Sequence, residues 1–212
     1  SSGRRLSSLS SNGRLREKAL HGLIQSEDAE ALPFVLLRLN DWVPVVRRLA
    51  ENWFDSMASR IPITSLIASM PILAALTDRC QSTGSRIAQR LKDRIVIETP
   101  HGELIGAVSR ANPRTRRLVF ELLGRQGALE DTEVQSRLFG DPNPVLGILL
   151  LNSLRRSHGS LPECAVHHAL PSRSAMLRRS MLYYLTSSQL ASNAELLRGC
   201  LTDESKGVRQ FV

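Results

Sequence analysis

The sequence predicts an all-α fold made of repeated helical pairs, and three observations support this prediction. Related turn-and-helix segments recur about every 30 residues along most of the chain. Residues typical of helix starts, such as Asn112-Pro113, stand at the beginning of these segments. Aromatic residues make up only 4% of the 212 residues, so the core is built from aliphatic side chains, which favours packed helices over an aromatic-lined sheet.

The repeat is clearest at the two ends of the chain. The segment around Asp41 and the segment around Asp203 both place four residues after the Asp, then Val and Arg. Related segments between them begin at Cys80, Asn112, Asp141 and Ser172. The near-constant spacing of these six positions is typical of a solenoid in which each repeat is one helical pair.

Each repeat contains two helical patterns. The first helices are expected at 29–39, 64–77, 102–109, 131–139, 161–169 and 192–201. The second helices are expected at 42–57, 83–98, 113–124, 142–156, 172–186 and 204–212. Asp141-Pro142 is expected to open one of them, and Ser192 with Glu195 has capping-box spacing. Apolar residues recur at helical spacing on the second helices, so each pair needs a neighbour to bury its apolar face.

The turns resemble those of short HEAT repeats of the phycobilisome-lyase-like kind, over roughly residues 14 to 212. The resemblance implies a right-handed α–α superhelix, a HEAT-like α-solenoid of about six helical pairs. It also implies that the turn Asp and the helix Arg form a structural ladder between neighbouring repeats. The implied ladder residues are Asp41, Arg47, Asp203 and Arg209.

The domain boundaries follow from this repeat. We expect a single repeat domain over 14–212 and a flexible leader over 1–13, where Ser and Arg dominate. The central repeats are degenerate, since Cys80, Asn112 and Ser172 replace the Asp and Gly147 stands where an Arg is expected. Because the chain ends within the last expected helix, we expect either a piece of a longer array or an array that lacks an ordinary cap.

Arginine is the most informative residue type for function. The chain has 28 basic and 20 acidic residues, and only Lys18, Lys92 and Lys206 among the basic ones are lysines. One cluster, over residues 86–117, includes Arg110, and a second runs from Arg155 to Arg179. In the resembled family the second helices line a concave groove, so an arginine stripe there would suit acidic peptides or phosphates. The alternative is that these arginines form a solvated face and ladder contacts.

The sequence offers little support for chemistry. No phosphate-binding glycine loop, nucleophile elbow or His–carboxylate pair is present, so no catalytic residue and no cofactor are predicted. Cys164 and His167 have the spacing of metal ligands but lack a second pair nearby, so no metal site is predicted. The three cysteines lie far apart, which fits a reducing, cytoplasmic setting, and the longest uncharged stretch is short for a membrane span.

The favoured interpretation is a non-catalytic scaffold that binds a protein or peptide, which we expect to be acidic, in its concave groove. The residues expected to bind this partner are Arg86, Arg90, Arg117, Arg155, Arg178 and Trp42. Trp42 is either an exposed anchor or a packed residue, whereas Trp53 falls on the apolar stripe and is expected in the core.

Two rival functions stay open. The first is nucleic-acid binding by the same arginines, including a base-excising repair enzyme, although no acidic and aromatic residues gather at one position. The second is a chromophore-attachment lyase, which rests on the family resemblance alone. The oligomeric state is not predicted.

Overall fold

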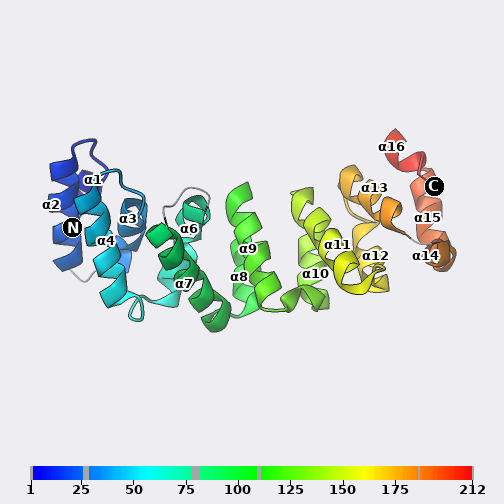
Figure 1. The fold of residues 1–212 in the computed structure, drawn as a ribbon. Helices are drawn as coiled ribbons and strands as arrows, with labels where there is room; N and C mark the ends of the chain where they lie inside the picture. Colours follow the sequence, from blue (N-terminus) through cyan, green and yellow to red (C-terminus); the bar gives the residue numbers. More distant parts are fainter. Residues whose placement is uncertain (1, 26–28, 78–81, 109–110, 186, 212) are drawn as a thin grey trace. The chain divides into compact units, whose positions relative to one another are not determined.

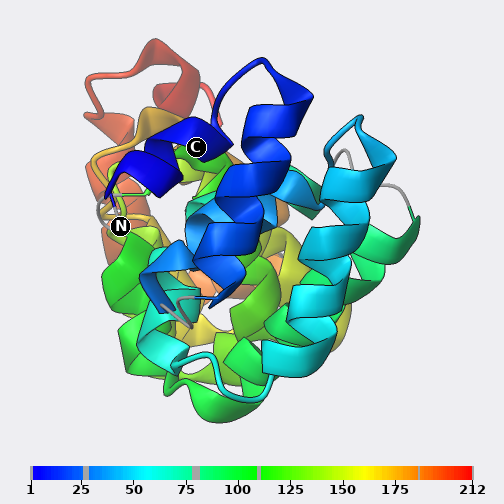
Figure 2. The ribbon, with the colours of Figure 1, turned by 90° about the vertical axis from the view of Figure 1, so that its left-hand side faces the viewer.

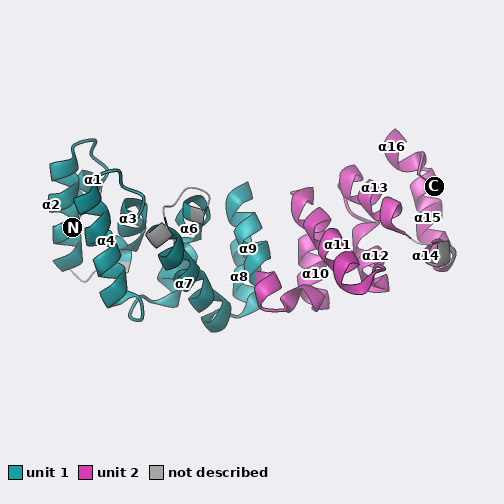
Figure 3. Cartoon of the chain, in the orientation of Figure 1, with its two compact units in different colours: residues 1–122 teal, residues 123–212 magenta. Residues whose placement is uncertain are grey.

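The computed structural model describes residues 2–25, 29–77, 82–108, 111–185 and 187–211. All regular secondary structure in these ranges is helical, which confirms the predicted all-α class. The contacts divide the chain into two compact units, Ser1–Leu122 and Leu123–Val212, which are teal and magenta in Figure 3. The single repeat domain expected over 14–212 stays a prediction.

In the first unit, shorter helices alternate with longer ones (Figure 1). The elements are α1 (Ser2–Ser8), α2 (Gly13–Gln25), the 3₁₀ helix η1 (Ala29–Ala31), α3 (Leu32–Arg38), α4 (Pro44–Met57), α5 (Ile63–Ala68), α6 (Met70–Thr77), α7 (Ser82–Glu98), α8 (His101–Val108) and α9 (Pro113–Arg125). Helix α3 contacts α6, while α4 contacts both α2 and α7. Over α2 to α7, successive first helices and successive second helices are thus in contact, and α3 and α6 also pack on the second helices of their own pairs, α4 and α7.

The second unit repeats this arrangement. It contains the 3₁₀ helix η2 (Ala128–Glu130), α10 (Thr132–Phe139), α11 (Pro144–His158), α12 (Glu163–Ala169), α13 (Ala175–Tyr184), α14 (Ser187–Ser192), α15 (Ala194–Leu201) and α16 (Lys206–Arg209). The first helices α10 and α12 contact each other, and the second helices α11, α13 and α16 contact one another in succession. The faces between them are filled mainly by Leu, Val and Ala, as the composition predicts.

The second helices follow a period that is more regular than the sequence pattern suggests. They begin at Gly13, Pro44, Ser82, Pro113, Pro144, Ala175 and Lys206. These starts are evenly spaced along the chain, except for one longer interval between Pro44 and Ser82. The helical pair α1/α2 therefore belongs to the same series, ahead of the first pair expected from the sequence.

The longer interval contains one additional helix. Helix α6 begins one regular interval before α8, so it occupies the place of a first helix, and α5 is extra. One continuous helix was expected at 64–77, but the chain breaks at Ser69. Pro71 explains the break, because its ring would collide with the carbonyl group of Ile67 in a continuous helix.

Two expected helix starts differ from the structure. Helix α11 begins at Pro144 with Asn143 as its cap, rather than at Asp141-Pro142, because the Asn143 side chain accepts the Val145 N–H. Helix α15 begins at Ala194 after Asn193, so Ser192 does not open a capping box there. Asn112 is a helix cap, as expected, and its Oδ1 accepts the Thr115 N–H at 2.9 Å.

The stretch expected to be a flexible leader contains helix α1. Figures 1 and 2 both show α1 beside α2, and the two helices are in contact. Arg4 Nη1 donates a hydrogen bond to the Gly22 carbonyl oxygen at 2.9 Å, and Ser8 is buried. Across the described ranges, every helix is too short or too polar to cross a membrane.

Candidate functional site

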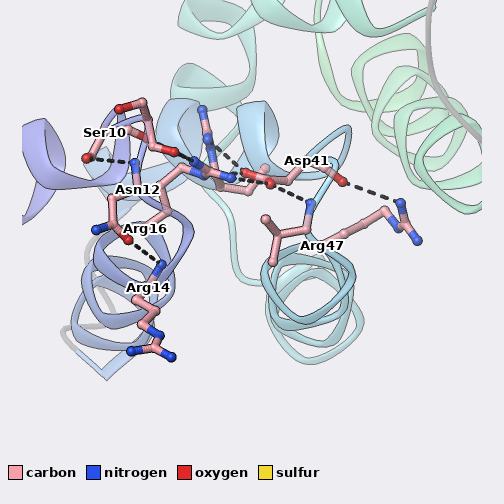
Figure 4. A network of polar contacts seen from close by, with 9 residues as sticks. Ser10, Asn12, Arg14, Arg16, Asp41 and Arg47 are labelled. Carbon is pink, nitrogen blue, oxygen red and sulfur yellow. Dashed lines mark hydrogen bonds and ion pairs between the residues drawn. The ribbon is translucent and has the colours of Figure 1, made fainter.

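In two second helices, the fourth residue is an arginine that ties one repeat to the next. In α2 this residue is Arg16, which is almost fully buried. Its Nε and Nη2 atoms donate to the two carboxylate oxygens of Asp41 at 2.8 and 2.9 Å (Figure 4). Its Nη1 atom donates to the carbonyl oxygens of Ser10 and Ser11. One guanidinium thus joins its own turn to the turn that precedes α4.

The same arrangement recurs in the second unit. Arg178 is the fourth residue of α13, and its Nε and Nη2 atoms donate to Asp203 at 2.6 and 2.7 Å. Its Nη1 atom donates to the Ser172 carbonyl oxygen at 2.6 Å. We call the Arg16–Asp41 and Arg178–Asp203 pairs the turn ladder. The structure places Arg178 in this ladder, which accounts for all three of its donor groups, rather than leaving it free for a partner as expected.

The residues expected from the resemblance fall into two roles. Asp41 and Asp203 are the acceptors of the turn ladder, and each also accepts the backbone N–H two residues later. Arg47 and Arg209 instead donate to the carbonyl oxygens of Asp41 and Asp203 within their own turns. The carboxylate of each aspartate thus pairs with the arginine of the preceding repeat, Asp41 with Arg16 and Asp203 with Arg178.

The ladder also determines the charge of its carboxylates. Burial alone would raise the pKa of Asp41, but the hydrogen bonds from Arg16 and from the Val43 backbone outweigh it, so the pKa is lowered. The pKa of Asp203 is lowered as well, chiefly by the hydrogen bond from Arg178. Both aspartates are therefore ionised at neutral pH.

Trp42 lies over the buried end of the ladder. Its ring is 77% exposed, and the Arg16 guanidinium carbon is 5.4 Å from the ring centroid. This is a cation–π contact that covers one side of the Arg16–Asp41 pair. Of the two alternatives weighed for Trp42, the structure therefore excludes the packed residue, and the outer ring face is accessible to a partner. Trp53, by contrast, is buried as predicted.

The fifth residue of consecutive second helices forms the most distinctive surface feature. It is Arg48 in α4, Arg86 in α7 and Arg117 in α9, and all three side chains are exposed. We call these three residues the arginine column. Because consecutive helical residues point about 100° apart, the fourth residue faces the turn and the fifth faces solvent. The column includes Arg86 and Arg117 of the expected set, and Arg48 completes it.

The acidic residues near the column are engaged elsewhere. Glu51 pairs with Arg47, Asp55 with Arg90, Glu98 with Arg94 and Glu121 with Lys92. Arg48, Arg86 and Arg117 make no ion pair with any described residue. The second helices α4, α7 and α9 therefore present three arginines without an ion-pair partner among the described residues, whereas the same position of α2 carries Glu17.

The remaining expected arginines have neighbours of their own. Arg90 Nη1 lies 3.1 Å from Asp55 Oδ1, and both side chains are more than half exposed, so the pair adds little stability. Arg155 stacks over the Tyr184 ring at 4.7 Å. Next to this ring, an open hollow of about 380 Å³ is lined by Met176, Arg179, Ser180, Tyr183, Tyr184 and Phe211.

Lys92 is an anomaly within the repeat. It is the eleventh residue of α7, a position occupied by Leu23 in α2, Phe54 in α4 and Leu154 in α11. Its side chain is 2% exposed, and its Nζ lies 3.1 Å from the half-exposed Glu121 carboxylate of α9. The pair therefore joins two second helices, with the ammonium group at the rim of the core.

The histidines do not gather into a metal centre. His167 and His168 line an open hollow of about 730 Å³ between the turns at 139–142 and 171–174. Among the residues that the structure describes, no three His, Cys, Asp or Glu side chains lie close enough to hold a metal ion. Cys164 and Cys200 are free thiols, and burial raises the pKa of Cys200. Cys80 and Arg110 lie outside the described residues.

Neither the models of known protein families nor the curated proteins include a match to this chain. The site must therefore be judged on its own geometry. Sequence reasoning missed Arg16 and Arg48, although a signal for both was present. Arg16 precedes Asp41 by 25 residues, as Arg178 precedes Asp203. Arg48 directly follows Arg47 in the best-defined repeat.

Proposed function

We propose that this chain is a non-catalytic HEAT-like repeat scaffold that binds an acidic protein or peptide along its second helices. The observation that supports this proposal is the arginine column, three exposed and uncompensated arginines at one position of consecutive helices. Guanidinium groups suit carboxylates because their planar donor geometry matches two carboxylate oxygens.

The proposal includes the architecture expected from the resemblance, a right-handed α-solenoid whose second helices line a concave groove. The regular spacing of the second helices supports it, and so do the contacts between successive second helices, α2–α4–α7 in the first unit and α11–α13–α16 in the second. The free thiols of Cys164 and Cys200 support a reducing, cytoplasmic setting.

The test is a fluorescence-anisotropy titration of the chain into labelled polyglutamate, and into labelled duplex and single-stranded oligonucleotides, at several salt concentrations. We expect polyglutamate to bind and its affinity to fall as salt rises, since the charges are exposed. Tighter binding of the oligonucleotides under the same conditions would favour the rival function, nucleic-acid binding, with a slope of log affinity against log salt near −0.9 for each phosphate neutralised on duplex DNA.

A charge-matched pair of variants makes the test specific to the column. The triple variant R48Q/R86Q/R117Q is expected to lose most of the affinity for polyglutamate. The control R60Q/R156Q/R198Q removes the same amount of charge from exposed arginines outside the column, and it is expected to keep its affinity for polyglutamate. Equal losses in both variants would show a non-specific effect of net charge and would refute a dedicated site.

A further inference from the structure

We infer that the hollow of about 380 Å³ beside Tyr184 binds an aromatic side chain of the acidic partner. This inference rests on the function proposed above and specifies how the partner is held. We call the site the aromatic hollow, and all of its lining residues lie in the second unit: Met176, Arg179, Ser180, Tyr183, Tyr184 and Phe211.

The aromatic hollow exposes large apolar side chains whose arrangement is fixed by contacts. Tyr183 is 68% exposed, Met176 is 52% exposed and Phe211 is 42% exposed. The Tyr183 ring makes edge-on contacts with the rings of Tyr184 and Phe211, at centroid separations of 5.3 and 6.5 Å. The Tyr184 hydroxyl donates to Asn152 Oδ1 at 2.8 Å, which joins this wall of the hollow to α11. Exposed apolar side chains that gather in this way are typical of a binding surface.

Two arginines lie against the rings of the hollow with unused donor groups. The Arg155 guanidinium carbon is 4.7 Å from the centroid of the Tyr184 ring. The Arg179 guanidinium carbon is 5.1 Å from the centroid of the Phe211 ring. These cation–π contacts orient both guanidinium groups. Neither group makes an ion pair or a side-chain hydrogen bond with a described residue, so both are available to carboxylates of a partner.

The second helices around the hollow carry no acidic residue. Helices α11, α13 and α16 contact one another in succession, and their sequences include arginine and lysine but neither Asp nor Glu. The turn before α16 carries Asp203, which is paired with Arg178, and Glu204. The partner that complements this face is therefore acidic around its apolar anchor.

The size and shape of the hollow suit a single side chain. Sites for small ligands commonly have volumes of about 300–1,000 Å³, and this hollow lies near the lower end of that range. Protein partners commonly insert an aromatic anchor into such a hollow and surround it with polar contacts. Single-stranded nucleic acid instead stacks successive bases on a series of ring faces. The edge-on packing of the rings around one hollow favours a peptide with one aromatic anchor between acidic residues.

The experiment titrates the full chain into three labelled nonapeptides at low salt and follows fluorescence anisotropy. The first peptide has a central Phe with two glutamates on each side, the second has Ser in place of the Phe, and the third has Gln in place of the glutamates. We expect the first to bind at least about tenfold more tightly than the second, because burial of an aromatic ring is commonly worth that factor. The third should bind a few-fold more weakly than the first, since it offers no carboxylate to Arg155 and Arg179.

A matched pair of variants makes the test specific to the hollow. Y183A/F211A removes two of its exposed rings and is expected to bind the first peptide no more tightly than the second. L190A/L201A removes two exposed apolar side chains elsewhere in the same unit and is expected to keep the tenfold preference. All four side chains are exposed, so both variants should show the circular dichroism spectrum of the parent chain.

The outcomes separate this inference from the proposed function. Equal affinities for the first and second peptides would overturn the inference, and the proposed function would stand if R48Q/R86Q/R117Q weakened both. If none of the peptides binds, and polyglutamate does not bind either, the proposed function fails and the inference fails with it. Binding of the first peptide that Y183A/F211A weakens and L190A/L201A does not weaken would support the inference.

Two other occupants of the hollow would also overturn the inference. Tighter binding of a single-stranded oligonucleotide than of the first peptide, lost in Y183A/F211A, would assign the rings to base stacking. Dimerisation of the full chain that Y183A/F211A abolishes, without binding of any peptide, would assign the hollow to a second copy of this chain. Sedimentation velocity at several protein concentrations measures the dimerisation.

Discussion

Arg16 shows how much structure one side chain organises in this chain. Its guanidinium donates to the Asp41 carboxylate and to the Ser10 and Ser11 carbonyl oxygens, so all three of its nitrogens are bonded. The cost of burying a charge is offset only when the pairing is this complete. Removing either partner should therefore be far more damaging than removing an exposed ion pair.

The Asp41→Asn variant tests this reasoning through pH. The Arg16 hydrogen bond holds the folded-state pKa of Asp41 below its unfolded value of about 3.9, so its contribution is present at neutral pH. It is lost as pH falls through the lowered folded-state pKa. We expect D41N to reduce the free energy of unfolding by about 3 kcal/mol at pH 7 and to differ little from the parent protein in strong acid.

Urea unfolding followed by circular dichroism at several pH values measures this difference. The control is Asp55→Asn, which breaks an exposed pair and should cost less than about 0.5 kcal/mol. A D41N penalty that stays constant down to strong acid would contradict the role assigned to the ionised carboxylate.

Lys92 provides a second prediction at the residue scale. Since the equivalent position is Leu or Phe in other repeats, Lys92→Leu should fit the core and be neutral or stabilising by about 1 kcal/mol. Lys92→Ala should destabilise by about 2 kcal/mol, because it leaves a cavity. Thermal unfolding of both variants tests these two expectations. An equal loss of stability in Lys92→Leu and Lys92→Ala would show that the Lys92–Glu121 pair itself stabilises the unit.

At the scale of the element, α11 explains why the repeat pattern weakens in the middle of the chain. Its fourth residue is Gly147, and a Cβ atom there would lie 2.7 Å from Leu177 Cδ2 of α13. Leu177 is fully buried and cannot easily move aside. Close packing of α11 on α13 has thus replaced the ladder, and Ser172 stands where the Asp partner of this helix would be.

A pair of glycine variants separates close packing from helix propensity. Gly147→Ala should lower the free energy of unfolding by about 1–3 kcal/mol, since it overpacks the α11/α13 contact. Gly106→Ala in α8 meets nothing within 4 Å, so it should raise stability by up to about 1 kcal/mol. Chemical denaturation measures both variants, and stabilisation by G147A would show that Leu177 has room to adjust.

The same elements show what the sequence could predict. The helical pairs and the turn acceptors Asp41 and Asp203 were predictable, because caps, prolines and apolar spacing are local signals. The expected alignment of Asn112 with Asp41 was not accurate, since Asn112 is a helix cap whereas Asp41 stands two residues before one. The aspartate partner of each ladder arginine could not be predicted from local signals, because it lies 25 residues along the chain, on another repeat.

At the scale of the whole molecule, the chain consists of two units that are each compact by their own contacts. In repeat proteins a local loss of stability spreads mainly to the nearest neighbours. We expect D41N to speed amide hydrogen exchange within Ser1–Leu122 and to leave Leu123–Val212 nearly unchanged. Hydrogen exchange followed by mass spectrometry of peptides checks this, and acceleration across both units would reveal one cooperative fold.

The extra helix α5 bears on how such a chain tolerates changes in length. It stands between α4 and α7 in the chain, in the stretch that also holds the first helix α6, and α7 and α9 after it keep their fifth residue as an exposed arginine. One residue inserted early in a second helix would turn the following side chains by about 100° and carry the arginine out of line. Insertions and deletions should therefore accumulate among the first helices during evolution, while the lengths of the second helices stay under selection.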